Sequence, residues 1–236
     1  YIINTHSHAD HTWGNYLFPG ATILSHSLCR QLMQEKGPAA LEAARKQNPV
    51  FRQVKLAMPH LTFEKGEISL RIGKKTLVLS HTPGHSSDGI SILVEEDRIL
   101  FAGDAFLPIP YVVDGDMDQL TETIKRVGKM GLENIVQGHG DIILRGEIDD
   151  AVKENQAYLS NLRKAVRAAA KRRNPQDALA MIDVESCGKS RVYLGGLAED
   201  LHRRNVRYIY KQILAEMGEM PPSQPEPADI EEEETL

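Results

Sequence analysis

The sequence is poor in cysteine, in long apolar runs and in excess basic charge. Two cysteines, Cys29 and Cys187, are too few for a disulfide framework. No apolar run approaches the roughly 18 residues that a membrane-spanning helix needs, so an integral membrane protein is excluded and no membrane partner is expected. Lys and Arg number 28 against 33 Asp and Glu. Without a strongly basic domain, no nucleic-acid partner is expected either.

The acidic charge gathers at the C-terminal end of the chain. No basic residue follows Lys211, whereas 8 of the 33 acidic residues do, which leaves 28 basic against 25 acidic residues up to that point. Proline and glutamate dominate from Pro221 onward, and this composition predicts a disordered acidic tail over 221–236. With 41% hydrophobic and 26% charged residues, the chain as a whole has an ordinary globular composition.

Apolar periodicity predicts strands and helices in a mixed order. We expect strands at 68–72, 76–79, 90–94, 99–102 and 135–136. Helices are expected at 27–33, 117–130, 176–187 and 195–217, with a long helix of about seven turns beginning at Ile148. Paired strands followed by helices indicate a layered α/β or α+β architecture. Residues 1–4 are typical of a strand already in progress, so we expect the chain to begin inside a fold.

Four short segments, each at the end of an expected strand, hold the chemically interesting side chains. They contain His6, His8, Asp10 and His11; then His85; then Asp104; and finally His139. Loops at strand ends converge at one edge of a sheet, where ligand sites form. A single buried histidine is more often a hydrogen-bonded core residue than a ligand, but four such segments in order favour a metal site.

The donor types and their number indicate two metal ions. Imidazole and carboxylate without thiolate suit zinc, iron or manganese. Five histidines and two aspartates are too many for one tetrahedral ion and about right for two, with Asp104 shared between them. Two ions roughly 3.5–4 Å apart with a shared hydroxide form a hydrolytic centre.

The motifs H-S-H-A-D-H, H-T-P-G-H-S, F-A-G-D and Q-G-H-G resemble the metal-site signatures of the metallo-β-lactamase superfamily over about residues 1–145. The resemblance implies an αββα sandwich with a dinuclear site at one edge. It assigns His6, His8 and His85 to the first ion, Asp10, His11 and His139 to the second, and Asp104 to a bridge.

The chemistry that this resemblance implies is hydrolysis. Two divalent ions, zinc or alternatively iron or manganese, would hold a hydroxide that attacks an ester, thioester, lactone or related carbonyl bond. Asp10 would be catalytic, because it would orient the nucleophile and receive its proton. A mononuclear iron persulfide dioxygenase of the same fold is the alternative, although it uses fewer ligands.

Departures from the family pattern refine this expectation. The family has several strands before its first histidine motif, so residues 1–146 are expected to be an N-terminally incomplete catalytic domain, followed by a helical extension over 147–220. One group of true β-lactamases has Cys at the position of Asp104, and flavo-diiron proteins have Glu at that of His8. The chain therefore resembles glyoxalase II-like and lactonase-like members more than true β-lactamases.

Residues beside the motifs suggest a pocket for a small-molecule substrate. Trp13, Phe106 and Tyr111 are expected to line it, with the Tyr111 hydroxyl donating to an oxyanion. Trp13 is equally well explained as a core aromatic beneath the metal loop. The helices of 147–217 would contact an anionic substrate or support a homodimer, and we expect a cytoplasmic protein.

Overall fold

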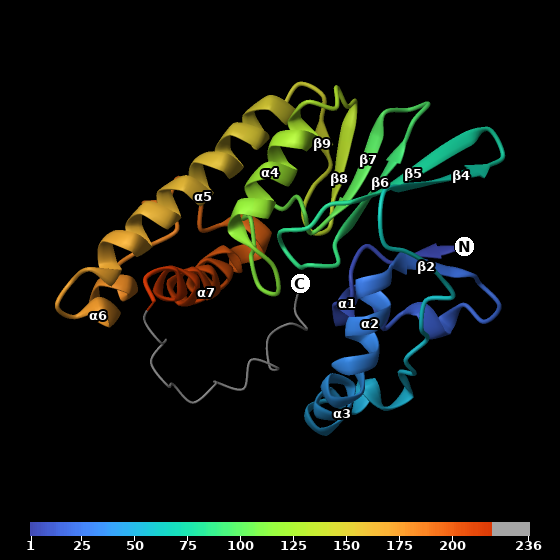
Figure 1. Cartoon of the computed structure of the whole chain (residues 1–236), viewed down its shortest axis with the longest axis horizontal. Coiled ribbons are helices and arrows are strands. Elements are labelled where there is room, and N and C mark those ends of the chain that lie inside the picture. Colours follow the sequence, from blue (N-terminus) through green and yellow to red (C-terminus); the bar gives the residue numbers. More distant parts are fainter. Residues whose placement is uncertain (219–236) are drawn as a thin grey trace.

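The computed structural model describes residues 1–218 and contains two sheets with helices on their outer sides (Figure 1). The acidic tail expected over 221–236 lies outside the described residues. The smaller sheet is parallel, in the order β1 (Ile2–Ile3), β2 (Ile23–His26) and β3 (Leu61–Phe63). Its connections contain α1 (Ala9–Thr12), α2 (Ser27–Glu35), α3 (Gly37–Gln47) and the 3-10 helices η1 (Asn15–Leu17) and η2 (Pro49–Gln53).

The larger sheet has six strands in sequential order. They are β4 (Glu67–Ile72), β5 (Lys75–His81), β6 (Ile90–Val94), β7 (Ile99–Gly103), β8 (Asn134–Gln137) and β9 (Ile143–Leu144). All neighbours are antiparallel except β7 and β8, which run parallel because α4 (Met117–Gly128) crosses between them. Two antiparallel steps separate β5 from β7, so β5, β7 and β8 run in the same direction and end at one edge.

The C-terminal helices share the core of this sheet. They are α5 (Ile148–Ala170), α6 (Pro175–Ala180) and α7 (Ala198–Glu216), with the short 3-10 helix η3 (Tyr193–Gly196) before the last. Leu100 of β7, Leu162 of α5 and Ile209 of α7 belong to one buried cluster. In Figure 1, α4–α7 lie to the left of the six-stranded sheet, whereas α1–α3 lie below it on the right. A domain boundary at residue 146 stays a prediction, because one apolar core continues across it.

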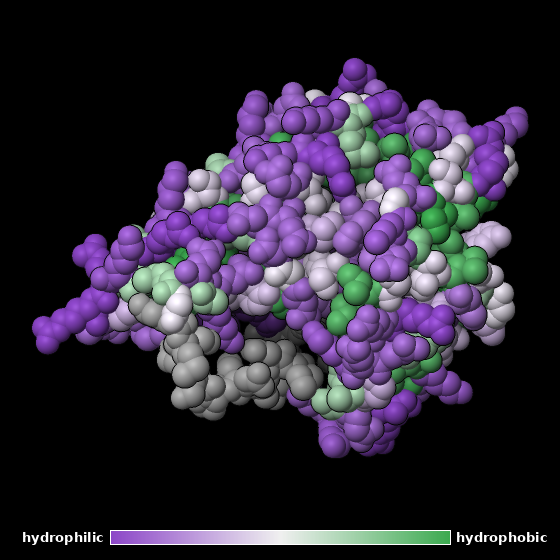
Figure 2. Space-filling view, in the orientation of Figure 1, coloured by the Kyte–Doolittle hydropathy of each residue, from purple (hydrophilic) through white to green (hydrophobic). Residues whose placement is uncertain are grey.

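The visible surface and the two cysteines complete the description of the fold. Figure 2 shows a mostly hydrophilic face on which hydrophobic residues gather near strands β4–β7. Cys29 and Cys187 are buried, unbonded thiols. Within residues 1–218, no helix is both long and apolar enough to cross a membrane.

One expected helix is shorter in the structure. The helix predicted over 176–187 ends at Ala180. Asp183 then forms a turn, because its side chain accepts a hydrogen bond from Ser186 N at 2.7 Å and its carbonyl accepts another from Ser186 Oγ at 2.7 Å. Gly188 continues with φ of +94°, a left-handed conformation that a helix does not use. Strands β2, β3 and β9 were not predicted, because runs of two to four residues carry little periodicity.

Candidate metal centre

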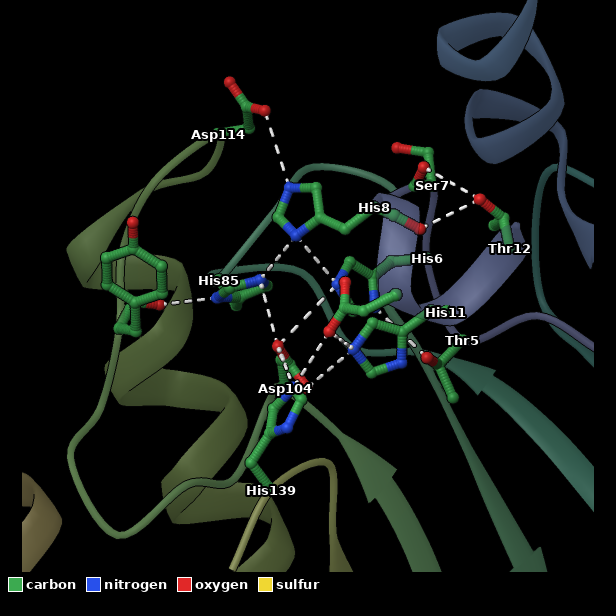
Figure 3. A network of polar contacts seen from close by, with 12 residues as sticks. Thr5, His6, Ser7, His8, His11, Thr12, His85, Asp104, Asp114 and His139 are labelled. Atoms are coloured by element: carbon green, nitrogen blue, oxygen red, sulfur yellow. Dashed lines mark hydrogen bonds and ion pairs between the residues drawn. The ribbon is translucent and has the colours of Figure 1, made fainter. Parts of the chain in front are cut away.

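The strand ends bring the four motif segments to one edge of the fold. Asp104 follows β7 and His139 follows β8, and a hydrogen bond of 2.9 Å from Gly138 N to Gly103 O holds these two ends together. The β1 end is tied to the larger sheet by Ile90 N, which donates to Thr5 O at 2.8 Å. Figure 3 shows the histidines of these segments gathered around Asp104. Topology therefore brings together residues more than 130 positions apart.

The first group of donors is His6, His8, His85 and Asp104. His8 Nδ1 lies 2.9 Å from His6 Nε2 and 3.1 Å from His85 Nε2. Asp104 Oδ2 lies 3.5 Å from His85 Nε2 and 3.8 Å from His6 Nε2. Ligands bound tetrahedrally to zinc at 2.0–2.1 Å are about 3.4 Å apart, so these donor atoms have the spacing that one ion requires.

The second group is Asp10, His11 and His139. The short helix α1 supplies the first two, and its first turn is fixed by Thr12 Oγ1, which donates to His8 O at 2.9 Å. His11 Nε2 and His139 Nε2 each lie 3.1 Å from Asp10 Oδ2. Asp104 Oδ1 lies 3.3 Å from His11 Nε2 and Asp104 Oδ2 lies 3.7 Å from His139 Nε2, so Asp104 approaches histidines of both groups.

Three donor atoms of the site are buried and lie close to other donors, but within residues 1–218 they make no hydrogen bond of good geometry. These atoms are His11 Nε2, His139 Nε2 and Asp104 Oδ1. Buried polar atoms are normally satisfied, and a cation at their common centre would satisfy all three. The residues therefore fit two divalent ions, and a set of nitrogen and oxygen donors is compatible with zinc, iron or manganese.

The other nitrogen of each first-group histidine is held by a neighbour. His6 Nδ1 lies 3.1 Å from Thr5 Oγ1, and His85 Nδ1 donates to Tyr111 O at 2.8 Å. His8 Nε2 lies 3.6 Å from Asp114 Oδ2. Such contacts fix the ring orientation and direct the remaining nitrogen toward the position of a metal.

Two of the first-group histidines, His6 and His85, are held neutral. Burial, followed by the nearby His8, lowers the pKa of His6 well below its ordinary value. Burial likewise lowers the pKa of His85 to about 4, although Asp104 opposes the shift. Neutral imidazole is the form that binds a metal, so these two rings are ready to act as ligands at neutral pH.

In the second group, the pKa of the histidine His11 is raised instead of lowered. Burial opposes protonation of His11, but the carboxylates of Asp10 and Asp104 outweigh it and raise the pKa of His11 to about 10. Burial would raise the pKa of Asp10, yet contacts with His11 and His139 hold it below its usual range. Without a metal this group therefore holds a proton on His11, and an incoming cation has to displace it.

The expected pocket residues take different positions. Trp13 is half-buried and packs edge-on against Phe51 of η2, with ring centroids 5.3 Å apart. Phe106 is 1% exposed and belongs to the main core cluster. Tyr111 contacts the site through its carbonyl, the acceptor of the His85 hydrogen bond. Pocket-lining roles for these three residues stay predictions.

Sequence reasoning missed several supports of the site. Thr5 and Asp114 face metal-site histidines, and the amides of Asn4 and Asn15 pair at 3.0 Å behind α1. Asn4 Nδ2 also donates to His11 O at 3.0 Å. Thr5 could have been suspected as the neighbour of His6, whereas no motif distinguishes the others.

An α/β fold with two sheets, outer helices and two His/Asp groups at one edge defines a metallo-β-lactamase-fold protein. A family model described as the Metallo-beta-lactamase superfamily matches residues 1–174, and the chain belongs to this superfamily. The predicted family and fold class are thereby confirmed.

The chain is similar to several curated proteins. It is 23% identical to the "Beta-lactamase-like protein 2 homolog" of Caenorhabditis elegans, over 78% of this chain and 55% of the relative. It is 27% identical to the "Lactamase-like protein aptB" of Emericella nidulans, over 65% of this chain and 42% of the relative. It is also 27% identical to the "Acyl-coenzyme A thioesterase MBLAC2" of Homo sapiens, over 58% of this chain and 54% of the relative. The chain thus spans about half the length of the curated relatives it matches.

Solved structures show the same fold. A metallo-beta-lactamase family protein from Thermus thermophilus matches with a TM-score of 0.64 at 19% identity, over 92% of this chain and 74% of that one. A metallo-beta-lactamase from Pontibacter korlensis matches with a TM-score of 0.52 at 18% identity, over 65% and 67%. These relatives are lactamase-like proteins and a thioesterase, so they do not support the expected particular likeness to glyoxalase II.

Proposed function

We propose that the protein is a dinuclear metal-dependent hydrolase of a small-molecule ester, thioester or lactone. The observation that carries the proposal is the position of Asp104, which lies 3.5 Å from His85 of the first group and 3.3 Å from His11 of the second. A carboxylate shared between two donor groups is the arrangement that holds two ions close together. Likeness to an acyl-coenzyme A thioesterase favours a thioester among these substrates.

The site residues would hold the metal ions, and Asp10 would also orient the attacking water molecule. Two divalent ions held here would act as Lewis acids and lower the pKa of water toward neutrality. The side chain of Asp10 is 28% exposed, against 7% for Asp104, so it is the carboxylate of the site that water reaches more easily. Its low pKa keeps Asp10 ionised, and an ionised carboxylate orients a water molecule by accepting its hydrogen bond.

Apolar side chains at and around Trp13 would suit an acyl substrate. Trp13 follows His11 by two residues and packs on Phe51, and Val50 next to Phe51 is 63% exposed. An acyl chain lying on such a surface would bury apolar area on both sides, at about 25 cal/mol per Å². Trp13 would then contact the part of the substrate that does not react.

A substrate panel tests the proposal. Metal-free protein is reloaded with zinc, manganese or iron and assayed on an acyl-coenzyme A thioester, a lactone, a β-lactam and a phosphodiester. We expect hydrolysis of the thioester or lactone that requires metal and is lost in His6→Ala. The matched control is His60→Ala, since His60 is exposed and accepts a hydrogen bond from Ile23 N at 3.0 Å.

Two outcomes would overturn this proposal. Hydrolysis that survives complete chelation would show that the metal groups are not responsible. One iron per chain with oxygen consumption on a persulfide would indicate the dioxygenase alternative instead.

A further inference from the structure

We propose that helix α7 positions the first metal group, through side chains that hold the segment 110–115. Asn205 is the main positioning residue, and Tyr208 is the second. The proposal rests on the proposed function only in requiring that this group binds a metal. It makes the C-terminal helix part of the metal centre, although none of its residues is a ligand.

The segment 110–115 provides contacts to two metal-site histidines. Tyr111 O accepts the hydrogen bond from His85 Nδ1 at 2.8 Å, so the proton stays on Nδ1 and the Nε2 lone pair faces the group. Asp114 Oδ2 lies 3.6 Å from His8 Nε2, on the side of the ring opposite the donor Nδ1. Figure 3 shows Asp114 and the donor group on opposite sides of the His8 ring. Displacing this segment would therefore release both rings.

The segment belongs to no helix or strand in the described chain. On one side it is bound to the loop of His85, through Val113 N to His85 O at 3.2 Å and Ser87 N to Asp114 O at 3.1 Å. These bonds tie the segment only to the loop that it has to orient. The position of the segment relative to the rest of the fold is set by another element, helix α7, which contacts the segment on its other side.

Three side chains on one face of α7 hold the segment in place. Asn205, Tyr208 and Gln212 are spaced i, i+3 and i+7, which places them on the same face of the helix. Tyr208 Oη donates to Gly115 O at 3.0 Å, and Gln212 Nε2 donates to the same oxygen at 3.4 Å. All three side chains bind main-chain groups of the segment, so they fix its path whatever its side chains are.

Asn205 brackets Tyr111. Its Oδ1 accepts from Val112 N at 2.9 Å and its Nδ2 donates to Pro110 O at 2.7 Å, so it holds the peptide groups on both sides of Tyr111, the second of which contains the Tyr111 carbonyl. Asn205 is 0% exposed, and Nδ2 also donates to Tyr158 Oη at 3.1 Å, which fixes the orientation of the amide. A fully paired buried network specifies a single arrangement.

The test compares two buried asparagines that both bind the chain after Asp104. Asn205→Ala removes the hydrogen bonds to Val112 N and Pro110 O on either side of Tyr111. Asn155→Ala is the matched control: Asn155 is 1% exposed, lies on α5 and donates to Leu107 O at 3.1 Å, upstream of the segment. Zinc affinity is measured by competition with a chelator. The His85 tautomer is read from ¹⁵N NMR of the metal-free protein.

We expect Asn205→Ala to weaken zinc binding at the first group by about tenfold, the lower end of the effect of such supporting contacts. His85 should lose its single Nδ1–H tautomer, and zinc affinity at the second group should stay unchanged. Asn155→Ala should lower the melting temperature and leave both metal readouts as in the parent protein. Equal effects of the two variants on zinc affinity and tautomer, or no effect of Asn205→Ala on either, would contradict the proposal.

A milder variant covers the case in which Asn205→Ala does not fold. Tyr208→Phe removes only the hydroxyl that binds Gly115 O and should weaken first-group zinc affinity about threefold, within the usual energy of one hydrogen bond. An unchanged affinity there would contradict the role of the α7 face. Because the tautomer is measured without metal or substrate, a protein that hydrolyses nothing would refute the proposed function and leave this inference standing.

Discussion

One oxygen of Asp104 lies 3.3 Å from Nε2 of His11, while its other oxygen faces the first donor group. Asp104 is 7% exposed, and the hydrogen bond from Gly138 N to Gly103 O holds the end of the strand that carries it. Among the described donor residues, it is the one that approaches histidines of both groups on opposite oxygens. Asp104 is therefore expected to hold the ions of the two groups close together.

Replacing this carboxylate tests the coupling. Asp104→Asn keeps the shape and removes the charge, so the bound metal should fall from two ions to about one per chain, with at least a hundredfold loss of turnover if the pair acts together. Metal content is measured by mass spectrometry. Asp141→Asn, an exposed aspartate two residues beyond His139, is the control and should keep both ions. Two ions per chain in Asp104→Asn would show that the bridge is not needed.

The glycine before His139 is required by the position of Asp104. A Cβ atom at Gly138 would lie 1.9 Å from Asp104 Oδ1 and 2.9 Å from the Gly103 carbonyl carbon, so Gly138→Ala must displace the carboxylate or the strand end. We expect it to lose metal at the second group and to lower the melting temperature. Gly146→Ala, where a Cβ meets nothing within 4 Å, is the matched control. Normal metal content in Gly138→Ala would contradict this geometry.

The raised pKa of His11 predicts a proton release on metal binding. With a pKa of about 10 in the metal-free protein, His11 is protonated at pH 8 and must become neutral to ligate zinc. Zinc binding to the second group should therefore release about one proton more than in His11→Gln. Calorimetry in buffers of different ionisation enthalpy measures this number, and an equal release in both proteins would rule out a protonated His11.

The same residue makes the stability of the metal-free protein depend on pH. The folded pKa of about 10 exceeds the unfolded value of about 6.5, so the stabilisation from His11 is complete below pH 6.5 and is lost as the pH rises through 10. The melting temperature should fall over this range, and the fall should be smaller in His11→Gln. Parallel curves for the two proteins would contradict the assignment.

The shared core predicts that the C-terminal helices unfold together with the sheets. Leu162 of α5 is 0% exposed in the main cluster, so Leu162→Ala should cost about 2–5 kcal/mol. Fluorescence of Trp13, the single tryptophan, reports on the metal loop, and far-UV circular dichroism reports on the helices. The two transitions should coincide and shift together in Leu162→Ala. A shift in dichroism alone would indicate a separate helical domain, with a boundary near residue 146.

The sequence was informative where chemistry is concentrated. His6, His8, Asp10 and His11 lie within six consecutive positions after a strand, and parallel strand ends bring His139 to the same edge. Helix α4 was predictable because Met117, Leu120, Ile124 and Val127 repeat at helical spacing and are all buried.

Contacts from side chains to distant main-chain groups leave no such pattern in the sequence. Asn205 binds the peptides around Tyr111 across more than 90 positions, and a backbone acceptor carries no sequence signature. No sequence pattern indicated that the Tyr111 carbonyl accepts a hydrogen bond from His85, or that the rings of these two residues lie 5.5 Å apart. The role of Asp114 beside His8 likewise depends on the path of an irregular segment, which periodicity does not describe.

Stepwise return of zinc to the metal-free protein, with hydrolysis of an acyl thioester followed at each step, tests the central claim most directly. We predict that hydrolysis is lost without metal, rises as zinc is added and levels off at two ions per chain, the number that the two donor groups imply. Hydrolysis at full rate in the metal-free protein, or a plateau reached with the second group still empty, would contradict the account.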